Sequence, residues 1–158
     1  MKTINKEYNQ DELIKKIELL IKDNICIGFT NGCFDLLHKG HIFLITEAKK
    51  NCDYLIVGIN SDNSVCNIKG PTRPVDSQIN RVKKLSKNND VDAVIIFYED
   101  TPLELIKKIK PNVLFKGADY KNKIVIGAEC VIKNGGKIEF IDILDGFSTT
   151  NIIKNSSI

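Results

Sequence analysis

The 158-residue sequence predicts one doubly wound α/β domain with a mainly parallel, five-stranded sheet. Two observations predict this fold class. Apolar runs of strand length alternate with segments of helical periodicity along the chain. The run at residues 53–60 is apolar almost throughout, which is typical of a strand buried on both faces of a parallel sheet. The β-α-β order with short links also predicts right-handed crossovers.

The first 24 residues are expected to hold a leading helix, ahead of an α/β core at residues 25–158. Leu13, Ile17 and Leu20 recur at helical spacing within residues 10–23. We expect this helix to pack on the core, with binding of a partner as the alternative.

The core strands follow from the remaining apolar runs. They are expected at residues 25–30, 53–60, 91–97, 113–116 and 137–144. Between the second and third strands, residues 60–74 are expected to form a surface loop that can close over a ligand. Gly70, Pro71 and Pro74 exclude a regular helix at the end of this loop.

Cap and stop signals mark the helices of the core. The expected helices are residues 40–50, 76–89, 101–109 and 128–133, followed by a last helix that Ser148 or Thr149 caps. Asp76 or Ser77 can cap the second of these, and Pro102 suits a first helical position. Gly135 and Gly136 give a typical C-terminal stop to the helix at 128–133.

Composition excludes several classes of protein. No apolar run approaches the length of a membrane span, and the N-terminus lacks the apolar core of a signal peptide. We therefore expect a cytoplasmic protein that does not bind membranes. The five cysteines form no C-x-x-C pair, which argues against a disulfide framework. A net charge of +3 suits anionic small molecules better than nucleic acid.

The stretch from Thr30 to Ile42 carries the strongest functional signal. An apolar strand leads into a glycine-containing turn, and a helical pattern leads out of it. Free backbone N–H groups and the positive end of the helix dipole make such a turn an anion site. His38 and His41 are the only two histidines, and both fall on the first helical turn with Gly40 between them. The alternative is an ordinary helix start that carries two polar residues.

Cys33 lies close to both histidines in sequence, so a metal site or a Cys–His nucleophile must be considered. The spacing of these residues matches no common zinc pattern. A small residue in a phosphate-binding turn is the favoured interpretation of Cys33.

The arginines stand out because the chain otherwise uses lysine. Arg73 and Arg81 are the only two arginines, and they lie within nine positions of each other. The planar guanidinium grips phosphate with two hydrogen bonds, which lysine cannot do. We expect both to hold phosphate, with two surface residues as the alternative.

Polar clusters follow four of the five predicted strands. They are residues 31–41, 60–62, 116–120 and 148–151. Carboxyl ends of parallel strands meet at one edge of the sheet, where such folds bind their ligands. The clusters are therefore expected to form one site.

Several of these segments resemble known proteins. His38-Lys39-Gly40-His41 resembles the HxGH signature of the nucleotidyltransferase superfamily, and Gly32-Cys33-Phe34-Asp35 is similar to the lead-in of its cytidylyltransferase-like branch. The chain from about residue 30 to 154 resembles the adenylyltransferases that activate D-glycero-β-D-manno-heptose 1-phosphate, which are often the second domain of a bifunctional heptose kinase. The further matching segments are residues 60–62, 69–70, 73–74, Arg81, 99–102, 116–120 and 145–153.

The resemblance implies a Rossmann-like fold and a transfer of AMP from ATP to the sugar 1-phosphate, with Mg²⁺ held largely by ATP oxygens and water. It implies that the catalytic residues are His38, His41, Lys69 and Arg81. It implies nucleotide contacts from Thr30, Asn31, Gly32, Cys33, Phe34, Asp35, Gly40, Arg73, Lys116, Gly117, Asp119, Tyr120, Ser148, Thr149 and Thr150. Asn60 and Asp62 are assigned to the sugar phosphate or ribose, and no residue is assigned as a metal ligand.

The same features leave other functions open. A cytidylyltransferase for glycerol 3-phosphate or another polyol phosphate would share the histidine turn, as would an FAD-synthetase-like adenylyltransferase. The segments at 116–120 and 145–153 favour the heptose branch over these. A nucleotide-sensing domain without activity is disfavoured because the histidines and the basic loop are intact. The resemblance also implies a separate heptose kinase upstream and self-association, in which the leading helix could take part.

Overall fold

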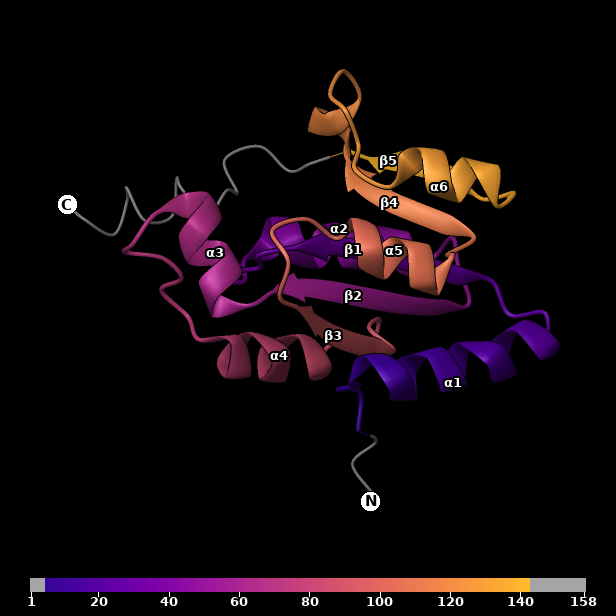
Figure 1. Ribbon diagram of the computed structural model, residues 1–158, viewed down its shortest axis with the longest axis horizontal. Helices are drawn as coiled ribbons and strands as arrows, with labels where there is room; N and C mark the ends of the chain where they lie inside the picture. Colours follow the sequence, from indigo (N-terminus) through magenta and orange to yellow (C-terminus); the bar gives the residue numbers. More distant parts are fainter. Residues whose placement is uncertain (1–4, 143–158) are drawn as a thin grey trace.

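The computed structural model describes residues 5–142 and has the predicted α/β architecture. Its five strands form one parallel sheet in the order β3-β2-β1-β4-β5 (Figure 1). The strands are β1 (Ile27–Gly32), β2 (Tyr54–Asn60), β3 (Ala93–Phe97), β4 (Val113–Gly117) and β5 (Lys137–Ile141). The order reverses at β1, which pairs with β2 on one side and β4 on the other. This switch point is where doubly wound sheets bind ligands.

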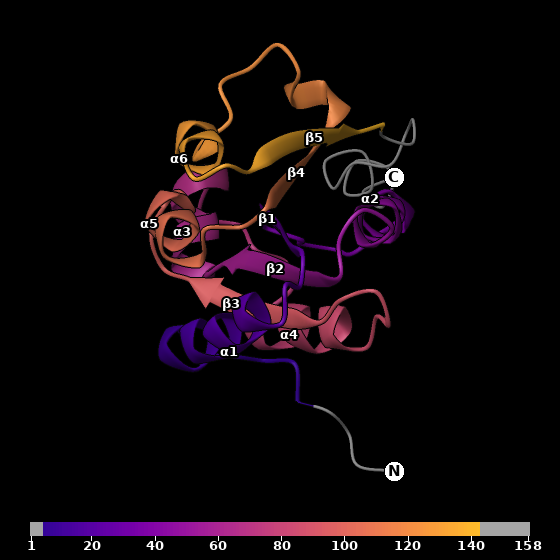
Figure 2. The ribbon, with the colours of Figure 1, turned by 90° about the vertical axis from the view of Figure 1, so that its right-hand side faces the viewer.

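Helices cover both faces of the sheet (Figure 2). They are α1 (Gln10–Lys22), α2 (Lys39–Lys49), α3 (Asp62–Lys69), α4 (Gln78–Ser86), α5 (Leu103–Ile109) and α6 (Ala128–Lys133), with a short 3₁₀ helix η1 (Ala118–Tyr120) after β4. None of the helices within residues 5–142 is long and apolar enough to cross a membrane.

Each face of the sheet has its own apolar core. On one face, α1, α5 and α6 bury residues such as Leu13, Ile106 and Val131 against the strands. On the other face, α2 and α4 bury residues such as Ile45 and Leu85. With both faces covered, the sheet is anchored from two sides, and its carboxyl edge can hold side chains in fixed positions.

The structure corrects the expected loop at residues 60–74. Residues 62–69 form helix α3, and only the part from Gly70 onward is irregular. Ser61 caps this helix, because its Oγ accepts a hydrogen bond from the Ser64 N–H at 3.2 Å. Pro71 and Pro74 restrict only the residues next to them, so they did not exclude a helix further upstream.

The other expected elements differ only at their ends. β1 and β3 each begin two residues later than the apolar runs do, and β4 and α6 match closely. Ser77, rather than Asp76, caps α4. Pro102 is the cap of α5 and not its first helical residue. The expected last helix, with Ser148 and Thr149, lies outside the described residues.

Candidate active site

A cavity of about 290 Å³ lies at the carboxyl ends of β1 and β4, against the first turn of α2. It is lined by Thr30, Asn31, Gly32, Cys33, Phe34, His38, Gly40, His41, Leu44, Lys69, Lys116, Gly117, Asp119 and Tyr120. The structure thus brings together residues from two of the four predicted clusters, 31–41 and 116–120, and adds Lys69. Leu44 is the one lining residue that the sequence analysis did not assign to the site. Its spacing of three from His41 on one helix was the signal for it.

The two histidines shape the start of α2. His38 is the helix cap, and its Nδ1 accepts a hydrogen bond from the Gly40 N–H at 3.1 Å. His41 Nδ1 accepts one from the His38 N–H at 3.2 Å, which completes a reciprocal capping box. The rings stack, with centroids 3.7 Å apart. Because a backbone N–H occupies each Nδ1, the neutral rings carry their proton on Nε2.

Both histidines are held in the neutral form. Burial lowers the pKa of His41 to about 3, and the charges of His38 and Lys69 act in the same direction. Burial also lowers the pKa of His38 from its ordinary value. At neutral pH each ring is therefore a neutral Nε2–H donor beside the positive end of a helix dipole. That is a suitable environment for phosphate oxygens.

The turn between β1 and α2 has unusual backbone geometry. Phe34 and Leu36 have φ angles of +48° and +55°, in the left-handed region that residues with a Cβ rarely adopt. Phe34 is buried, and its ring lies 5.1 Å from the His41 ring. Such strain is often found at functional sites. Here it occurs in the short turn that brings the Phe34 ring against His41.

Cys33 lines the cavity without the properties of a nucleophile. Its Sγ lies 3.8 Å from Asn60 Oδ1. Burial raises the pKa of the thiol above its ordinary value of 9.0, despite the opposing charges of Lys69, Arg81 and Arg73. A protonated thiol is a weak nucleophile. No group of three or more His, Cys, Asp or Glu within residues 5–142 could hold a metal ion. The alternatives built on Cys33 gain no support from this geometry.

Two lysines reach the cavity from opposite sides of β1. Lys69 ends α3, which follows β2, and Lys116 lies on β4. Lys116 is 9 % exposed, and its Nζ donates a hydrogen bond to Asn31 Oδ1 at 2.8 Å. Tyr120 presents its ring 5.2 Å from the same nitrogen. Burial lowers the pKa of Lys116 to about 8, against the opposing charge of Asp119.

Asp35 and Arg73 do not line the cavity. Asp35 is fully buried and accepts hydrogen bonds from Arg73 Nε, the Val75 N–H and the Asp76 N–H, at 2.8, 2.9 and 2.9 Å. Although burial raises its pKa, these donors outweigh that effect and hold the pKa below the ordinary value. The pair ties the irregular segment after α3 to the histidine turn. Arg73 Nη2 is buried without a partner among the described residues.

Arg81 also lies behind the cavity, as the largest fully buried side chain. Its guanidinium donates to the carbonyl oxygens of Cys33 and Asn60 at 2.7 Å each, to the Asp76 carbonyl at 3.1 Å and to Asp62 Oδ1 at 2.8 Å. Asn60 and Asp62 therefore meet Arg81 rather than the cavity. This network clamps the ends of β1 and β2 to α4, which favours a positioning role for all three residues.

The remaining predicted residues, Ser148, Thr149 and Thr150, lie outside the described part of the chain.

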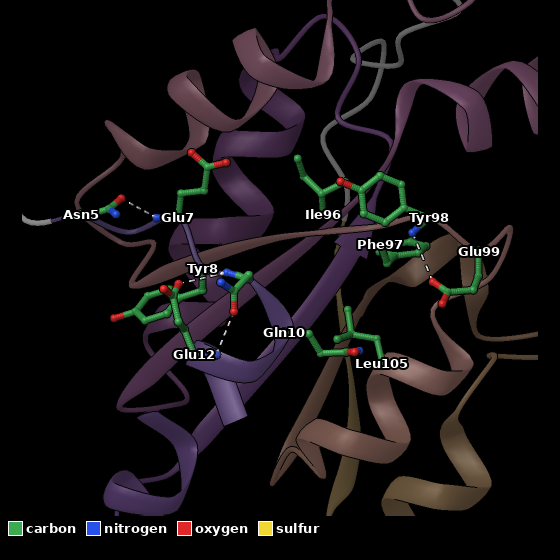
Figure 3. A pocket seen from close by; sticks show the side chains of 11 residues that line it. Asn5, Glu7, Tyr8, Gln10, Glu12, Ile96, Phe97, Tyr98, Glu99 and Leu105 are labelled. Atoms are coloured by element: carbon green, nitrogen blue, oxygen red, sulfur yellow. Dashed lines mark hydrogen bonds between the residues drawn. The ribbon is translucent and has the colours of Figure 1, made fainter. Parts of the chain in front are cut away.

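A second cavity of about 440 Å³ lies between α1 and the end of β3 (Figure 3). Its lining includes Glu7, Glu12 and Glu99 but no Lys, Arg or His. Three carboxylates without a cation repel a triphosphate. The cavity at β1 and β4 is therefore the candidate active site, although the other is larger.

Comparisons with known proteins identify the family to which this chain is similar. The model of the family described as cytidylyltransferase-like matches residues 29–155. "Bifunctional protein HldE" of Nitrobacter hamburgensis is 47% identical over 146 residues, which are 92% of this chain and 30% of the relative. Its counterpart in Paramagnetospirillum magneticum is 56% identical over 128 residues, 81% of this chain and 26% of the relative.

The chain thus spans less than a third of the length of these curated relatives. A crystal structure described as the lipopolysaccharide core biosynthesis protein from Thermoplasma volcanium aligns with a TM-score of 0.61 and 25% identity. The alignment covers 76% of this chain and 97% of that one.

Proposed function

We propose that this chain, which belongs to the cytidylyltransferase-like family, transfers AMP from ATP to D-glycero-β-D-manno-heptose 1-phosphate. A phosphate oxygen of the sugar 1-phosphate forms a bond to the α-phosphorus of ATP. The bond from the α-phosphorus to the α–β bridging oxygen breaks, and its electron pair leaves with pyrophosphate. The products are ADP-heptose and pyrophosphate.

The observation that carries this proposal is the pair of neutral histidines at the start of α2. Their Nδ1 atoms are occupied by backbone donors, so in each neutral ring the donor is Nε2–H. In phosphoryl transfer, negative charge spreads over the oxygens of the attacked phosphorus, and prepositioned donors lower the barrier. The mechanism needs no covalent intermediate on the protein, in keeping with a Cys33 thiol that stays protonated.

Two further observations support the heptose branch as acceptor class. The curated relatives are named HldE and described as bifunctional, as expected of a family in which this domain often follows a heptose kinase. The segment Lys116 to Tyr120, one of those that resemble the heptose branch, contributes Lys116, Gly117, Asp119 and Tyr120 to the cavity.

Mg²⁺ fits this site as a companion of ATP rather than as a resident of a protein cage. Asp119 is the one carboxylate among the cavity residues within 5–142, and the oxygens of Asp35 already accept three hydrogen bonds. Mg²⁺ commonly keeps several waters and binds through substrate phosphates plus one or two carboxylates. When bound, it would neutralise triphosphate charge, with Asp119 as the available protein ligand.

The proposal is tested by incubating the protein with Mg²⁺, pyrophosphatase and each of ATP, CTP, GTP and UTP. Heptose 1-phosphate and glycerol 3-phosphate serve as acceptors, and phosphate release is measured. Release with ATP and heptose 1-phosphate alone is expected. Release with CTP and glycerol 3-phosphate would instead assign the chain to the polyol phosphate cytidylyltransferases, the second candidate.

The cellular setting is part of the same proposal. A kinase can supply the sugar 1-phosphate, and we propose that a heptose kinase works before this enzyme in the cytoplasm. Self-association of the chain is a further proposal, which analytical ultracentrifugation of the purified protein tests directly.

A further inference from the structure

Lys116 carries a buried charge that is not neutralised by an ion pair within residues 5–142. Its Nζ donates to a neutral amide, Asn31 Oδ1, and faces the ring of Tyr120. Asp119 attracts it electrostatically, but the ion pairs of the described chain do not include Lys116. A buried charge is costly unless it is paired. An ammonium group has three donors, so this one can accept an anionic partner as well as Asn31.

The location of Lys116 indicates which anion it meets. β2 and β4 pair with opposite edges of β1, and the histidine turn follows β1 between them. Lys69 comes from the β2 side and Lys116 from the β4 side, and both line the same cavity. An in-line transfer places the attacking and leaving groups on opposite sides of the reacting phosphorus. Both groups are phosphates here, so two separated cations suit this arrangement.

We propose that Lys116 binds the phosphate group of the acceptor and positions it for attack, while the histidines hold the phosphate under attack. This inference rests on the proposed function, because it assigns an acceptor to one side of that site. It gives Lys116 a role toward the acceptor, in place of the nucleotide contact that the resemblance implied. Lys69, on the β2 side of the cavity, is assigned to the leaving pyrophosphate.

The first test is kinetic and uses Lys116→Met. Methionine keeps the length and apolar stem of lysine and removes the charge. Loss of a charged hydrogen bond to phosphate is expected to raise the KM for heptose 1-phosphate by about tenfold to a hundredfold. The KM for ATP should change by less than about threefold. An increase confined to the KM for ATP would overturn the proposal, since Lys116 would then serve the nucleotide.

Lys123→Met is the matched control. Lys123 is exposed and lies 5.4 Å from the same Tyr120 ring, so this variant removes an equal charge from the same neighbourhood. Its KM values should match those of the unmodified chain. If Lys123→Met raises the KM for the acceptor as much as Lys116→Met does, the increase reflects the loss of any positive charge near the cavity, and the proposal fails.

A thermal unfolding measurement separates this role from a structural one. A buried charge without an ion pair carries a desolvation cost that an apolar side chain of similar size does not. Lys116→Met without ligand should therefore have an unchanged or higher Tm. A lower Tm with unchanged KM values would show that Lys116 is structural. If Lys116→Met does not fold, Lys116→Gln keeps a donor without the charge and is measured in the same way.

A binding experiment distinguishes failure of this inference from failure of the proposed function. The nucleotide subsite is filled with α,β-methylene ATP, which does not react, and inorganic phosphate is titrated calorimetrically. Phosphate should bind to the unmodified chain and to Lys123→Met, and about tenfold or more weakly to Lys116→Met. Equal binding to all three overturns the inference even where heptose 1-phosphate turns over. Lys116-dependent binding without turnover of any acceptor supports the anion site and overturns the heptose assignment.

Discussion

The two arginines and the two cavity lysines carry the same charge but use it differently. Arg81 is 1 % exposed, and its hydrogen bonds go to three backbone carbonyls and Asp62. Lys69 and Lys116 line the cavity, and within the described chain neither forms an ion pair with a carboxylate. The arginines therefore hold the strand ends and the histidine turn in place, and we call their hydrogen-bond network the frame of the site. The lysines remain available to a ligand. The sequence analysis placed all four in the nucleotide site, the arginines from their residue type and the lysines from the family resemblance.

The first prediction tests the frame. Arg81→Met leaves the carbonyls of Cys33 and Asn60 without the guanidinium donor, while Asp62 keeps the Gln78 N–H. The free energy of unfolding should therefore fall by about 2–4 kcal/mol. Chemical denaturation measures this change. The exposed Lys83→Met on the same helix is the control and should change stability by less than about 0.5 kcal/mol. A rise in the KM for ATP without any loss of stability would contradict this structural role and indicate that Arg81 contacts the phosphates of ATP directly.

The contrast also shows what the sequence could predict. The positions of the strands and helices follow from apolar periodicity and cap residues, which are local. The order of the strands in the sheet was not predicted. Helix α3 was missed because Gly70, Pro71 and Pro74 dominate the composition of its neighbourhood. The hydrogen bonds of Arg81 join residues 48, 21 and 19 positions apart, and no local pattern encodes such pairing.

The second prediction concerns the histidine turn, the counterpart of the arginine frame. His41→Ala removes a prepositioned Nε2–H donor, so kcat should fall by a factor of about 10² or more. Circular dichroism should show that the variant stays folded. Ile42→Ala changes an exposed neighbour on the same helical turn and should retain near-normal turnover. Normal turnover of His41→Ala would refute the mechanism.

The third prediction sharpens the role of Lys116 by its titration. Its pKa is lowered to about 8, so the ammonium form that binds phosphate is lost as the pH rises through that value. At saturating ATP, kcat/KM for the acceptor should fall about tenfold per pH unit above 8. The groups that share this cavity are Cys33, His38, His41, Lys69, Asp119 and Tyr120. His41 and His38 are already neutral at pH 7, and the pKa of Cys33 is raised above 9.0.

A matched variant checks this assignment. Lys116→Arg stays charged throughout this range, so its profile should be flat from pH 7 to 9, whatever its absolute rate. The acceptor phosphate, with a second pKa near 6, is doubly charged over the same range and adds no slope of its own. A fall above pH 8 that persists in Lys116→Arg would assign the titration to another group.

The smallest effect expected is on stability at mildly acidic pH, and it tests whether the histidines are neutral. His41 has a folded-state pKa of about 3, against an unfolded value of 6.5. Between these values the unfolded chain binds a proton that the folded chain does not, so stability is complete above pH 6.5 and falls as the pH is lowered. At pH 5.5 the loss should be about 1 kcal/mol.

The carboxylate of Asp35, whose pKa is held below 3.8, adds its own loss of stability only at lower pH, where it becomes protonated in the unfolded chain. His41→Asn, which cannot gain the proton, should therefore show a shallower fall in the free energy of unfolding between pH 7 and 5. If the two proteins lose stability equally over this range, His41 is protonated in the folded state, and the histidine turn would then act as a cation like the lysines.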